Sequence, residues 1–271
     1  MFTTFMPFFL LLGRIRDTKG VEAVVQDDKN EVKLLMAGEA GLVVEFAAII
    51  STEINGLVQQ LMKLLKHESP PGIIEVVPTY KSITIYFNPL LTSRERITQL
   101  IRPLLSKIEP LATKCLTARM VHVPVCYGGV FGPDLEFVAR YAGMAPHEVI
   151  SLHTAKPYLV YMLGFTPGFP YLGGMSELIA VPRQEKPRTK VPAGSVGIGG
   201  NQTGVYPIES PGEWWLIGRT PLKTFQPASE DPFLISAGDY LRFYAISIEE
   251  YFAIRRAVES GNYIPEVSQI N

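Results

Sequence analysis

The cationic side chains of one proline-rich segment, VPRQEKPRTKVPAGS, have the types and spacing best suited to binding an anion. Arg183 and Arg188 lie on a backbone that is stiffened by a proline at every fifth position, at Pro182, Pro187 and Pro192. A guanidinium on a stiff chain can bind a carboxylate or a phosphate through two hydrogen bonds with little loss of conformational entropy. The segment is also compatible with a surface loop whose cations are only solvated.

Polar and aromatic side chains from the end of this segment onward could orient a small ligand in an otherwise apolar pocket. They are Ser195, Asn201, Gln202, Thr203, Tyr206, Glu209, Trp214 and Arg219. The glycines of residues 194–200 permit close approach of the backbone to a ligand, and their N–H groups could form an anion-binding nest. A tight turn at a barrel corner would explain the same glycines. In a strand, Trp214 and Trp215 face opposite sides, so we expect one in the core and the other as a platform.

Familiar catalytic motifs are missing from the sequence. Residues 194–200 have the glycine spacing of a P-loop, but Gly200 replaces its phosphate-binding lysine, and no HExxH, GxSxG or dinucleotide-binding fingerprint occurs. The four histidines are too dispersed to suggest a metal site, so none is predicted. His153 ends a short predicted helix, where its interaction with the helix dipole accounts for it without a catalytic role.

The segment GFTPGFPYLGG places three aromatic side chains, Phe165, Phe169 and Tyr171, among glycines and prolines that exclude a helix. We expect a stiff loop that presents these rings as the wall of a ligand pocket or of a subunit interface. A mere turn is the alternative, and the bonds before Pro167 and Pro170 could be cis.

Composition restricts the class of partner. The 271 residues carry a formal net charge of −1 and 47% of them are hydrophobic, so a core can form and neither nucleic acid nor an anionic membrane is an expected partner. The two cysteines lack metal-like spacing and fit a reducing, cytoplasmic compartment. The apolar run near the start is too short to span a bilayer and lacks the basic region of a signal peptide, so residues 1–30 are interpreted as a peripheral extension.

Hydrophobic patterns divide the rest of the chain into two domains. In residues 31–118 the order β-α-β-β-α, with a possible further strand, predicts a small ferredoxin-like α+β domain. Strands are expected at 32–36, 42–46, 72–77 and 83–87, and helices after Ser51 and in the capping box 92–95.

Residues 119–247 hold most of the glycines and prolines, which excludes long helices and leaves the short strands of a β-barrel or sandwich. Short helices are expected at 134–141 and 147–153, and strands at 158–163, 195–198, 214–218, 233–235 and 240–245. Residues 248–271 are expected to form a C-terminal helix over 248–258, followed by a tail.

Three motifs together indicate a family. GFTPGFPYLGG, the run VPRQEKPRTKVPAGSVGIGGNQTGVYPIESPGEWWLIGRTPL and the earlier VPVCYGGVFGPDL closely resemble the family of 5-oxoprolinase B subunits, also described as allophanate hydrolase subunit 1 or a KipI-type kinase inhibitor. The resemblance covers about residues 33–245 and implies a cyclophilin-like β-barrel after the α+β domain. It implies an ATP-dependent 5-oxoprolinase that opens 5-oxo-L-proline to L-glutamate together with an A subunit and with a C subunit of related barrel fold. ATP, with Mg²⁺, could then bind surfaces shared with a partner subunit.

The resemblance also implies roles for individual residues. It implies catalytic roles for Arg183, Arg188 and His153, with the arginines and N–H groups near Gly194 acting on the lactam carbonyl. It implies substrate binding by Ser195, Gln202, Tyr206, Trp214 and Arg219, and a pocket or interface wall made of Phe165, Phe169 and Tyr171. The chain departs from the family pattern at Glu213, which replaces a glycine and adds a charge beside the expected pocket.

Two alternatives stay open on the sequence alone. A hydrolase subunit of the allophanate or urea amidolyase type is compatible with the same motifs. A regulatory protein without chemistry of its own, which inhibits a sensor histidine kinase through exposed aromatic side chains of GFTPGFPY, is compatible as well.

Overall fold

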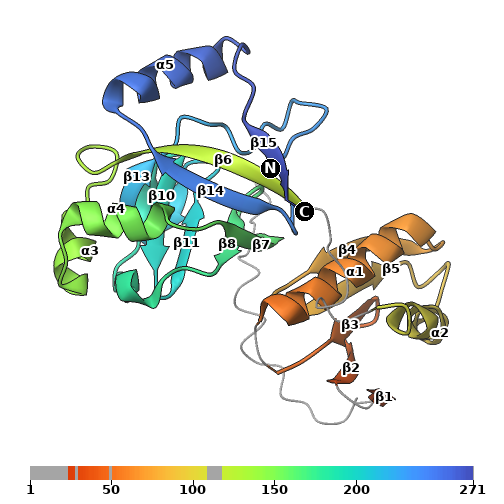
Figure 1. Cartoon of the computed structure of the whole chain (residues 1–271). Coiled ribbons are helices and arrows are strands. Elements are labelled where there is room, and N and C mark those ends of the chain that lie inside the picture. Colours follow the sequence, from red (N-terminus) through yellow and green to blue (C-terminus); the bar gives the residue numbers. More distant parts are fainter. Residues whose placement is uncertain (1–23, 28–29, 49–50, 109–117, 271) are drawn as a thin grey trace.

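The computed structural model describes residues 24–27, 30–48, 51–108 and 118–270, which form two main β-sheets (Figure 1). Each sheet has its own hydrophobic core. The extension expected at 1–30 falls mostly outside these ranges, and the domain boundary expected at residue 118 adjoins residues 109–117, which also lie outside them. Within the described ranges, each helix is too short or too polar to cross a membrane.

The N-terminal sheet has five antiparallel strands in the order β1-β2-β3-β5-β4. In chain order its elements are β1 (Val24–Asp27), β2 (Asn30–Met36), β3 (Gly41–Glu45), α1 (Thr52–Glu68), β4 (Ile73–Pro78), β5 (Ser82–Phe87) and α2 (Arg94–Leu105). The unit β3-α1-β4-β5-α2 is the predicted ferredoxin-like arrangement, with β5 between the parallel strands β3 and β4. β2 extends the sheet beside β3, and β1 lies within the range that was expected to be an extension.

Both helices of this domain cover one face of its sheet. Every second residue of β5, namely Ile83, Ile85 and Phe87, is buried, and these side chains join one cluster with α1 and α2. Ser51 caps α1 as expected, its hydroxyl accepting a hydrogen bond of 3.2 Å from the backbone N–H of Ile54. The cap of α2 is Ser93 rather than the preceding threonine, so this helix begins one residue later than the capping box predicted.

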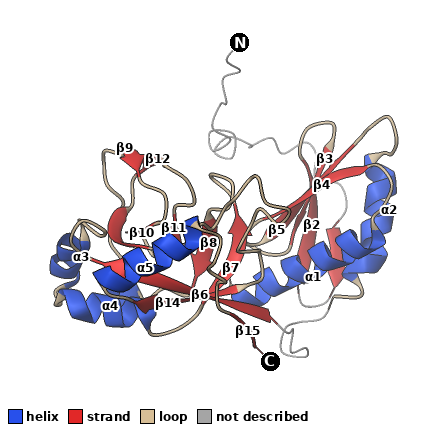
Figure 2. Ribbon diagram, turned by 90° about the horizontal axis from the view of Figure 1, so that it is seen from above, coloured by secondary structure: helices blue, strands red, loops and turns tan. Residues whose placement is uncertain are grey.

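The C-terminal sheet has its strands in the order β11-β10-β13-β6-β14-β7-β8 and curls into a nearly closed barrel. Its elements are β6 (Ala118–Tyr127), α3 (Leu135–Ala142), α4 (Pro146–Thr154), β7 (Tyr158–Leu163), β8 (Pro170–Gly173), a 3₁₀ turn (Glu177–Ile179), β9 (Arg188–Val191), β10 (Ser195–Gly199), β11 (Gln202–Val205), β12 (Ser210–Gly212), β13 (Trp215–Arg219), β14 (Tyr240–Ala245), α5 (Ile248–Glu259) and β15 (Val267–Ile270). β6 and β14 are parallel, and β9 and β12 form a small separate sheet. Figure 2 shows α3 and α4 at the end of the barrel far from the N-terminal sheet.

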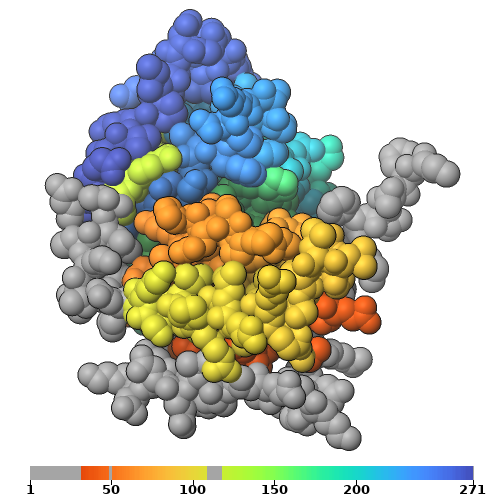
Figure 3. All heavy atoms as spheres, turned by 90° about the vertical axis from the view of Figure 1, so that its right-hand side faces the viewer, coloured from red at the N-terminus to blue at the C-terminus, as the bar shows by residue number. Residues whose placement is uncertain are grey.

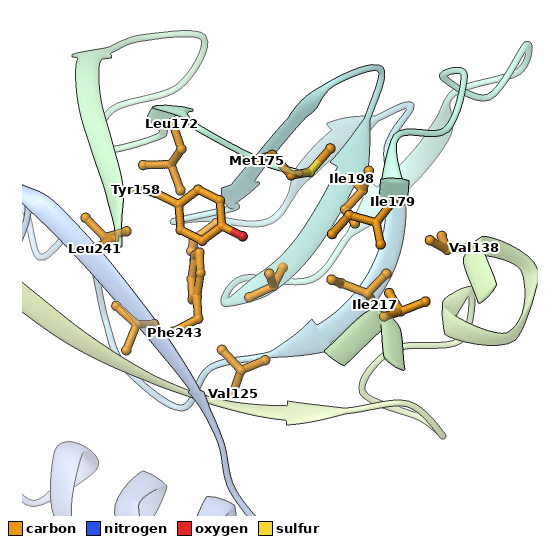
Figure 4. Packing of buried hydrophobic residues seen from close by; sticks show 14 of the residues in the cluster. Val125, Val138, Tyr158, Leu172, Met175, Ile179, Ile198, Ile217, Leu241 and Phe243 are labelled. Carbon is orange, nitrogen blue, oxygen red and sulfur yellow. The ribbon is translucent and has the colours of Figure 1, made fainter. Parts of the chain in front are cut away.

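The barrel interior is filled by side chains from all around the sheet (Figure 4). Tyr158 and Phe243 lie near one end, and Ile198 and Ile217 near the other, where Val138 of α3 closes the core. The interior is therefore a packed core rather than a ligand cavity.

Several short strands were not predicted. β8, β9, β11, β12 and β15 have three or four residues each, too few for a periodic pattern. β8 begins within GFTPGFPYLGG, so the expected loop ends at Phe169, and the bonds before Pro167 and Pro170 are trans. The strand predicted at 233–235 is wrong, because only an isolated bridge joins Phe225 and Phe233. The C-terminal tail returns to the sheet as β15 and pairs with β6.

The two domains are docked through buried amide side chains on α1. Gln59 donates a hydrogen bond of 3.0 Å to the carbonyl of Tyr161 on β7, and Asn55 donates to the same carbonyl at 3.5 Å. Within its own domain, Asn55 also donates to the carbonyls of Thr79 and Tyr80, both at 3.2 Å. Asn55 is fully buried and Gln59 nearly so. Figure 3 shows the resulting direct contact between the N-terminal domain, in orange and yellow, and the barrel in green and blue. These amides favour the docked arrangement, because burying an amide without a hydrogen-bond partner would cost free energy.

His153, at the end of α4, is fully buried and stacks against Phe243 with ring centroids 4.7 Å apart. The Thr203 hydroxyl donates to the carbonyl of Gly197 at 3.0 Å, so it accepts from the His153 Nε2–H at 2.8 Å. Nδ1 then accepts from the Tyr127 hydroxyl at 2.7 Å. Burial lowers the pKa of His153 to about 3, and the ring is a neutral tie between α4, β6 and β11.

Replacement of His153 by Gln is expected to flatten the pH dependence of stability. Because the folded pKa lies below the unfolded value, the unfolded state binds the extra proton, and stability present above pH 6.5 is lost as the pH falls. The loss amounts to about 2 kcal/mol between pH 7 and pH 5. Urea unfolding of the wild type and of His153→Gln at pH 7 and pH 5 measures this loss, because the other titrating groups contribute equally to the stability of both proteins. Parallel pH profiles would contradict the assignment.

Candidate functional site

A series of polar side chains lies on the outer face of the barrel, where it meets the N-terminal domain. We call Glu213, Arg183, Gln202 and Tyr80 the Arg183 network. Arg183 donates from Nη1 to the Glu213 carboxylate at 2.6 Å and from Nη2 to the Gln202 side-chain oxygen at 3.3 Å. The Gln202 amide nitrogen donates in turn to the Tyr80 hydroxyl. The guanidinium is thus fixed in orientation but remains about half exposed, at 46%.

Trp214 lies beneath this network, with the Arg183 guanidinium carbon 5.9 Å from its ring centroid. The ring is buried and rests on β10 and β11 at positions that lack a side chain. A Cβ atom at Gly199 would overlap the indole, only 2.6 Å from Nε1, and one at Gly204 would lie 3.1 Å from Cζ3. The glycines therefore make room for Trp214 rather than for a ligand.

The backbone around Gly194 does not form the anion nest that the sequence suggested. The N–H of Gly194 donates to the carbonyl of Tyr206 at 2.7 Å, and that of Ser195 donates to the carbonyl of Pro192 at 3.2 Å. Gly197 and Gly199 belong to β10 and pair with its neighbours. The alternative, a tight turn leading into a barrel strand, is correct, because the N–H groups of Gly194 and Ser195 are already bonded to backbone carbonyls.

The aromatic segment contributes mostly to an outer core rather than to an open wall. Phe169, 2% exposed, stands at the centre of edge-on contacts of 5.3–5.5 Å with Phe165, Tyr171, Tyr206 and Trp214. Burial raises the pKa of Tyr206 to about 12, so its hydroxyl stays protonated. Only Phe165 is open to solvent, at 52%, with a φ of 64° that is uncommon outside glycine.

Arg188 lies near the Arg183 network but is held in a more buried ion pair. It donates from Nη2 to an Asp134 oxygen at 2.7 Å and from Nη1 to the carbonyl of Trp214 at 3.3 Å. The second oxygen of Asp134 accepts from the N–H of Leu216 at 2.7 Å. This arrangement ties β9, β13 and the start of α3 together, and it fixes the main chain at Trp214.

Ser195 and Arg219 are separated from the Arg183 network. They are paired residues of β10 and β13, and Arg219 is also paired with Cys126 of β6, which packs against Tyr251 of α5. Ser195 is fully buried, and its hydroxyl has no hydrogen-bond partner among the described residues. His153 lies in the barrel core, as described above. The structure therefore brings together Arg183, Gln202 and Trp214, with Arg188, Tyr206 and the aromatic segment beside them, and places Ser195, Arg219 and His153 elsewhere.

Tyr80 is the residue of the network that the sequence did not reveal. It lies in the turn between β4 and β5, between the strands expected at 72–77 and 83–87. Its partner Gln202 is 122 positions away, so no local pattern signals the contact. Glu213 did give a signal, as a charge in place of a family glycine.

An open groove of about 460 Å³ runs beside the network. One side is formed by Phe137, Tyr141 and Trp215, and the other by residues 181–186. Phe137 stacks on Trp215 with ring centroids 3.8 Å apart, and the Trp215 indole N–H donates to the carbonyl of Pro182 at 2.7 Å. Trp214 is thus the core residue of the pair, and partly buried Trp215 lines the groove. In the part of the chain that the structure describes, no group of three or more metal-binding side chains occurs.

The variant Gly199→Ala is expected to displace Trp214 and, with it, Arg183. The added methyl group would overlap the indole ring, so the protein should lose about 1–3 kcal/mol of stability and its near-ultraviolet circular dichroism should change. Gly164→Ala is the control, because its new methyl group would only reach an ordinary 3.4 Å from Tyr171. Equal stability of the two variants would mean that Trp214 does not depend on the glycine.

Comparison with known proteins connects these features to a family. The family model described as carboxyltransferase domain, subdomain C and D, matches residues 32–235. The chain is 42% identical to the B subunit of the 5-oxoprolinase of Bacillus subtilis over 226 residues, which cover 80% of this chain and 94% of that protein. It is 40% identical to the B subunit of the 5-oxoprolinase of Escherichia coli O157:H7, over 79% of this chain and 96% of that one.

Solved structures agree with this fold. The crystal structure of TTHA0988 superposes with a TM-score of 0.68 at 36% identity, over 76% of this chain and 40% of that one, so this chain spans less than half of that protein. The urea amidolyase of K. lactis superposes with a TM-score of 0.72 over 93% of this chain and 17% of that one, and its 19% identity indicates a likeness of fold alone. From the family model and from the identity over nearly the whole length of two relatives, we conclude that the chain belongs to the family of 5-oxoprolinase B subunits.

Proposed function

We propose that this protein acts as the B subunit of a 5-oxoprolinase, which opens 5-oxo-L-proline to L-glutamate with ATP and is active only together with the A and C subunits. The proposal is supported by the identity to two proteins named as B subunits of 5-oxoprolinase, over more than nine tenths of each. A cytoplasmic location is part of it, in keeping with the buried free thiol of Cys126.

The observation that carries the chemical part of this proposal is the state of Arg183. An arginine has five N–H groups, of which Glu213 and Gln202 engage one each. The others lie on a half-exposed guanidinium whose direction is already set by two partners and by Trp214 beneath it. Such a group can donate to the lactam carbonyl oxygen, where negative charge develops as the amide is attacked. Little ordering entropy is lost when the substrate binds.

The other expected catalytic residues act in this proposal by holding the site. Arg188 fixes the backbone at Trp214, and His153 ties β11, which carries Gln202 at its start, to α4. The Thr203 hydroxyl is within reach of His153, but both groups are fully buried. They cannot meet a substrate, so the attacking group must come from water or from a partner subunit.

Substitution of Arg183 is expected to lower activity with little loss of stability. In a mixture of the three subunits with ATP and 5-oxoproline, kcat/KM for glutamate formation should fall about 10-fold for Arg183→Lys, which keeps the charge but not the planar fork, and about 100-fold for Arg183→Ala. The melting temperature should hardly change, since exposed ion pairs contribute about 0–1 kcal/mol.

Arg255→Lys is the matched control, because Arg255 forms an ion pair of similar exposure with Glu259 on α5. No glutamate from the wild-type mixture, under conditions in which the Bacillus subtilis subunits produce it, would refute the proposed function. Normal activity of Arg183→Ala would refute only the role of this side chain.

An amide other than 5-oxoproline is a second candidate substrate. The chain is 22% identical to the urea amidolyase of Saccharomyces cerevisiae over 88% of its length. Allophanate therefore belongs in the same assay as a parallel substrate. Inhibition of a histidine kinase remains a further alternative, with exposed Phe165 as the docking side chain.

The groove beside Arg183 is the place that we propose for ATP. Its stacked rings suit a purine, and Arg183 and Lys186 on the opposite side suit phosphate groups. Within the described residues, Lys186 has no ion-pair partner that would compete. When bound, ATP supplies the free energy for the opening, and Mg²⁺ would arrive on its phosphates, in a site that partner residues could complete.

Two substitutions separate recognition of the ring from recognition of the phosphates. With the reconstituted complex, Tyr141→Ala should raise the Kd for ADP and for adenosine about 5-fold, and Lys186→Ala should raise it for ADP and for pyrophosphate by a similar factor. Lys190→Ala should change none of them, because this lysine pairs with Glu209 away from the groove. Calorimetric titration measures all three, and identical ADP binding by all variants would place the nucleotide elsewhere.

A further inference from the structure

Tyr80 is contributed to the Arg183 network by the N-terminal domain, although every other member belongs to the barrel. It lies in the turn between β4 and β5 and points its hydroxyl at the side chain of Gln202 at the start of β11. Its contact is therefore the place where the domain interface and the candidate site coincide.

The position of Tyr80 is fixed on several sides. Its ring makes edge-on contacts with Tyr161 at 5.3 Å and Tyr171 at 5.9 Å, both on the barrel. Its backbone carbonyl accepts a hydrogen bond from Asn55 on α1. Burial raises the pKa of the hydroxyl, so it stays a neutral hydrogen-bonding group at physiological pH. The ring is thus a rigid support and not a mobile surface side chain.

The Gln202 amide can satisfy both neighbours in one orientation only. Its oxygen must face Arg183, because the guanidinium has donors and no acceptor. Its nitrogen then faces Tyr80, whose hydroxyl accepts the bond. Removal of that hydroxyl would leave the amide nitrogen without its partner, and the amide could turn away from Arg183.

We infer that Tyr80 is a positioning residue: through Gln202 it sets the orientation of Arg183, so the N-terminal domain must be docked for the barrel's site to be complete. This inference rests on the proposed function for its kinetic readout, but the geometry can also be tested without activity. Tyr80 itself touches no substrate, and its effect passes entirely through the amide.

The test is a double-mutant cycle of Tyr80→Phe and Gln202→Leu in the reconstituted complex. Tyr80→Phe removes one hydroxyl and keeps the ring contacts, so kcat should fall about 10-fold while KM and the melting temperature stay nearly unchanged. Gln202→Leu should cost at least as much, and the double variant should be no worse than Gln202→Leu alone, because both act on one link. Gln202→Glu, which keeps an acceptor for Arg183 and for the Tyr80 hydroxyl, should restore most of the rate.

The control is Tyr86→Phe. This variant also removes a tyrosine hydroxyl from the N-terminal domain, on β5, but that hydroxyl lies outside the Arg183 network. Independent, additive losses in the cycle, or wild-type kcat in Tyr80→Phe, would overturn the inference.

A second measurement separates this inference from the proposed function. Phenylglyoxal modifies arginines, and mass spectrometry can follow the rate at Arg183 in the full chain alone. If Tyr80 holds Arg183, Tyr80→Phe and Gln202→Leu should each speed modification of Arg183 about 3-fold or more, while Tyr86→Phe should not. A faster rate without any 5-oxoprolinase activity would keep the positioning role and reject the function. Unchanged rates of Arg183 modification in both variants, together with full 5-oxoprolinase activity of the wild-type complex, would reject the positioning role and keep the function.

Discussion

The indole of Trp214 packs against β10 and β11 of the barrel, and the candidate site depends on this contact. The ring can lie there only because Gly199 and Gly204 have no side chain where it rests. The Arg183 guanidinium lies over the ring, and the backbone carbonyl of Trp214 accepts hydrogen bonds from Gln184 and Arg188. Gly199, Gly204 and the aromatic side chains around Phe169 therefore hold a large ring rigidly under a charged group.

Burial gives different roles to two arginines from the same short segment. Arg188 is matched by the nearly buried Asp134, both of whose carboxylate oxygens accept hydrogen bonds, as a charge with little access to water requires. Arg183 pairs with Glu213 at the surface, where water still reaches both groups and several of its N–H donors remain available. A site for an anion or a polarised carbonyl needs an exposed donor such as Arg183. The more buried Arg188 instead holds the surrounding backbone in place.

The polar residues buried on α1 show why the two domains behave as one unit. A helix that only covered a sheet would place apolar side chains on its whole inner face, as most of α1 does. Gln59 and Asn55 instead donate hydrogen bonds to the carbonyl of Tyr161 on the barrel strand β7, at 3.0 and 3.5 Å. If the domains separated, these hydrogen bonds would be exchanged for bonds to water, so the contact is specific without being strongly apolar. The same docking brings Tyr80 to the edge of the Arg183 network.

Local patterns in the sequence determined the long elements, the α+β class and the two sites of interest, the arginines and the aromatic segment. α1 and β7 were predictable because each carries its own cap or periodicity within a few residues. The strands β8, β9, β11 and β12 were not, because three or four residues are too few for a pattern of their own and become strands only by pairing with other segments. Tertiary structure alone decided which arginine stays available, since the partners that settle it, Asp134 and Glu213, stand 54 and 30 positions away from Arg188 and Arg183. It alone brought Tyr80 to Gln202, because hydrogen bonds and burial depend on distance in space and not on distance along the chain.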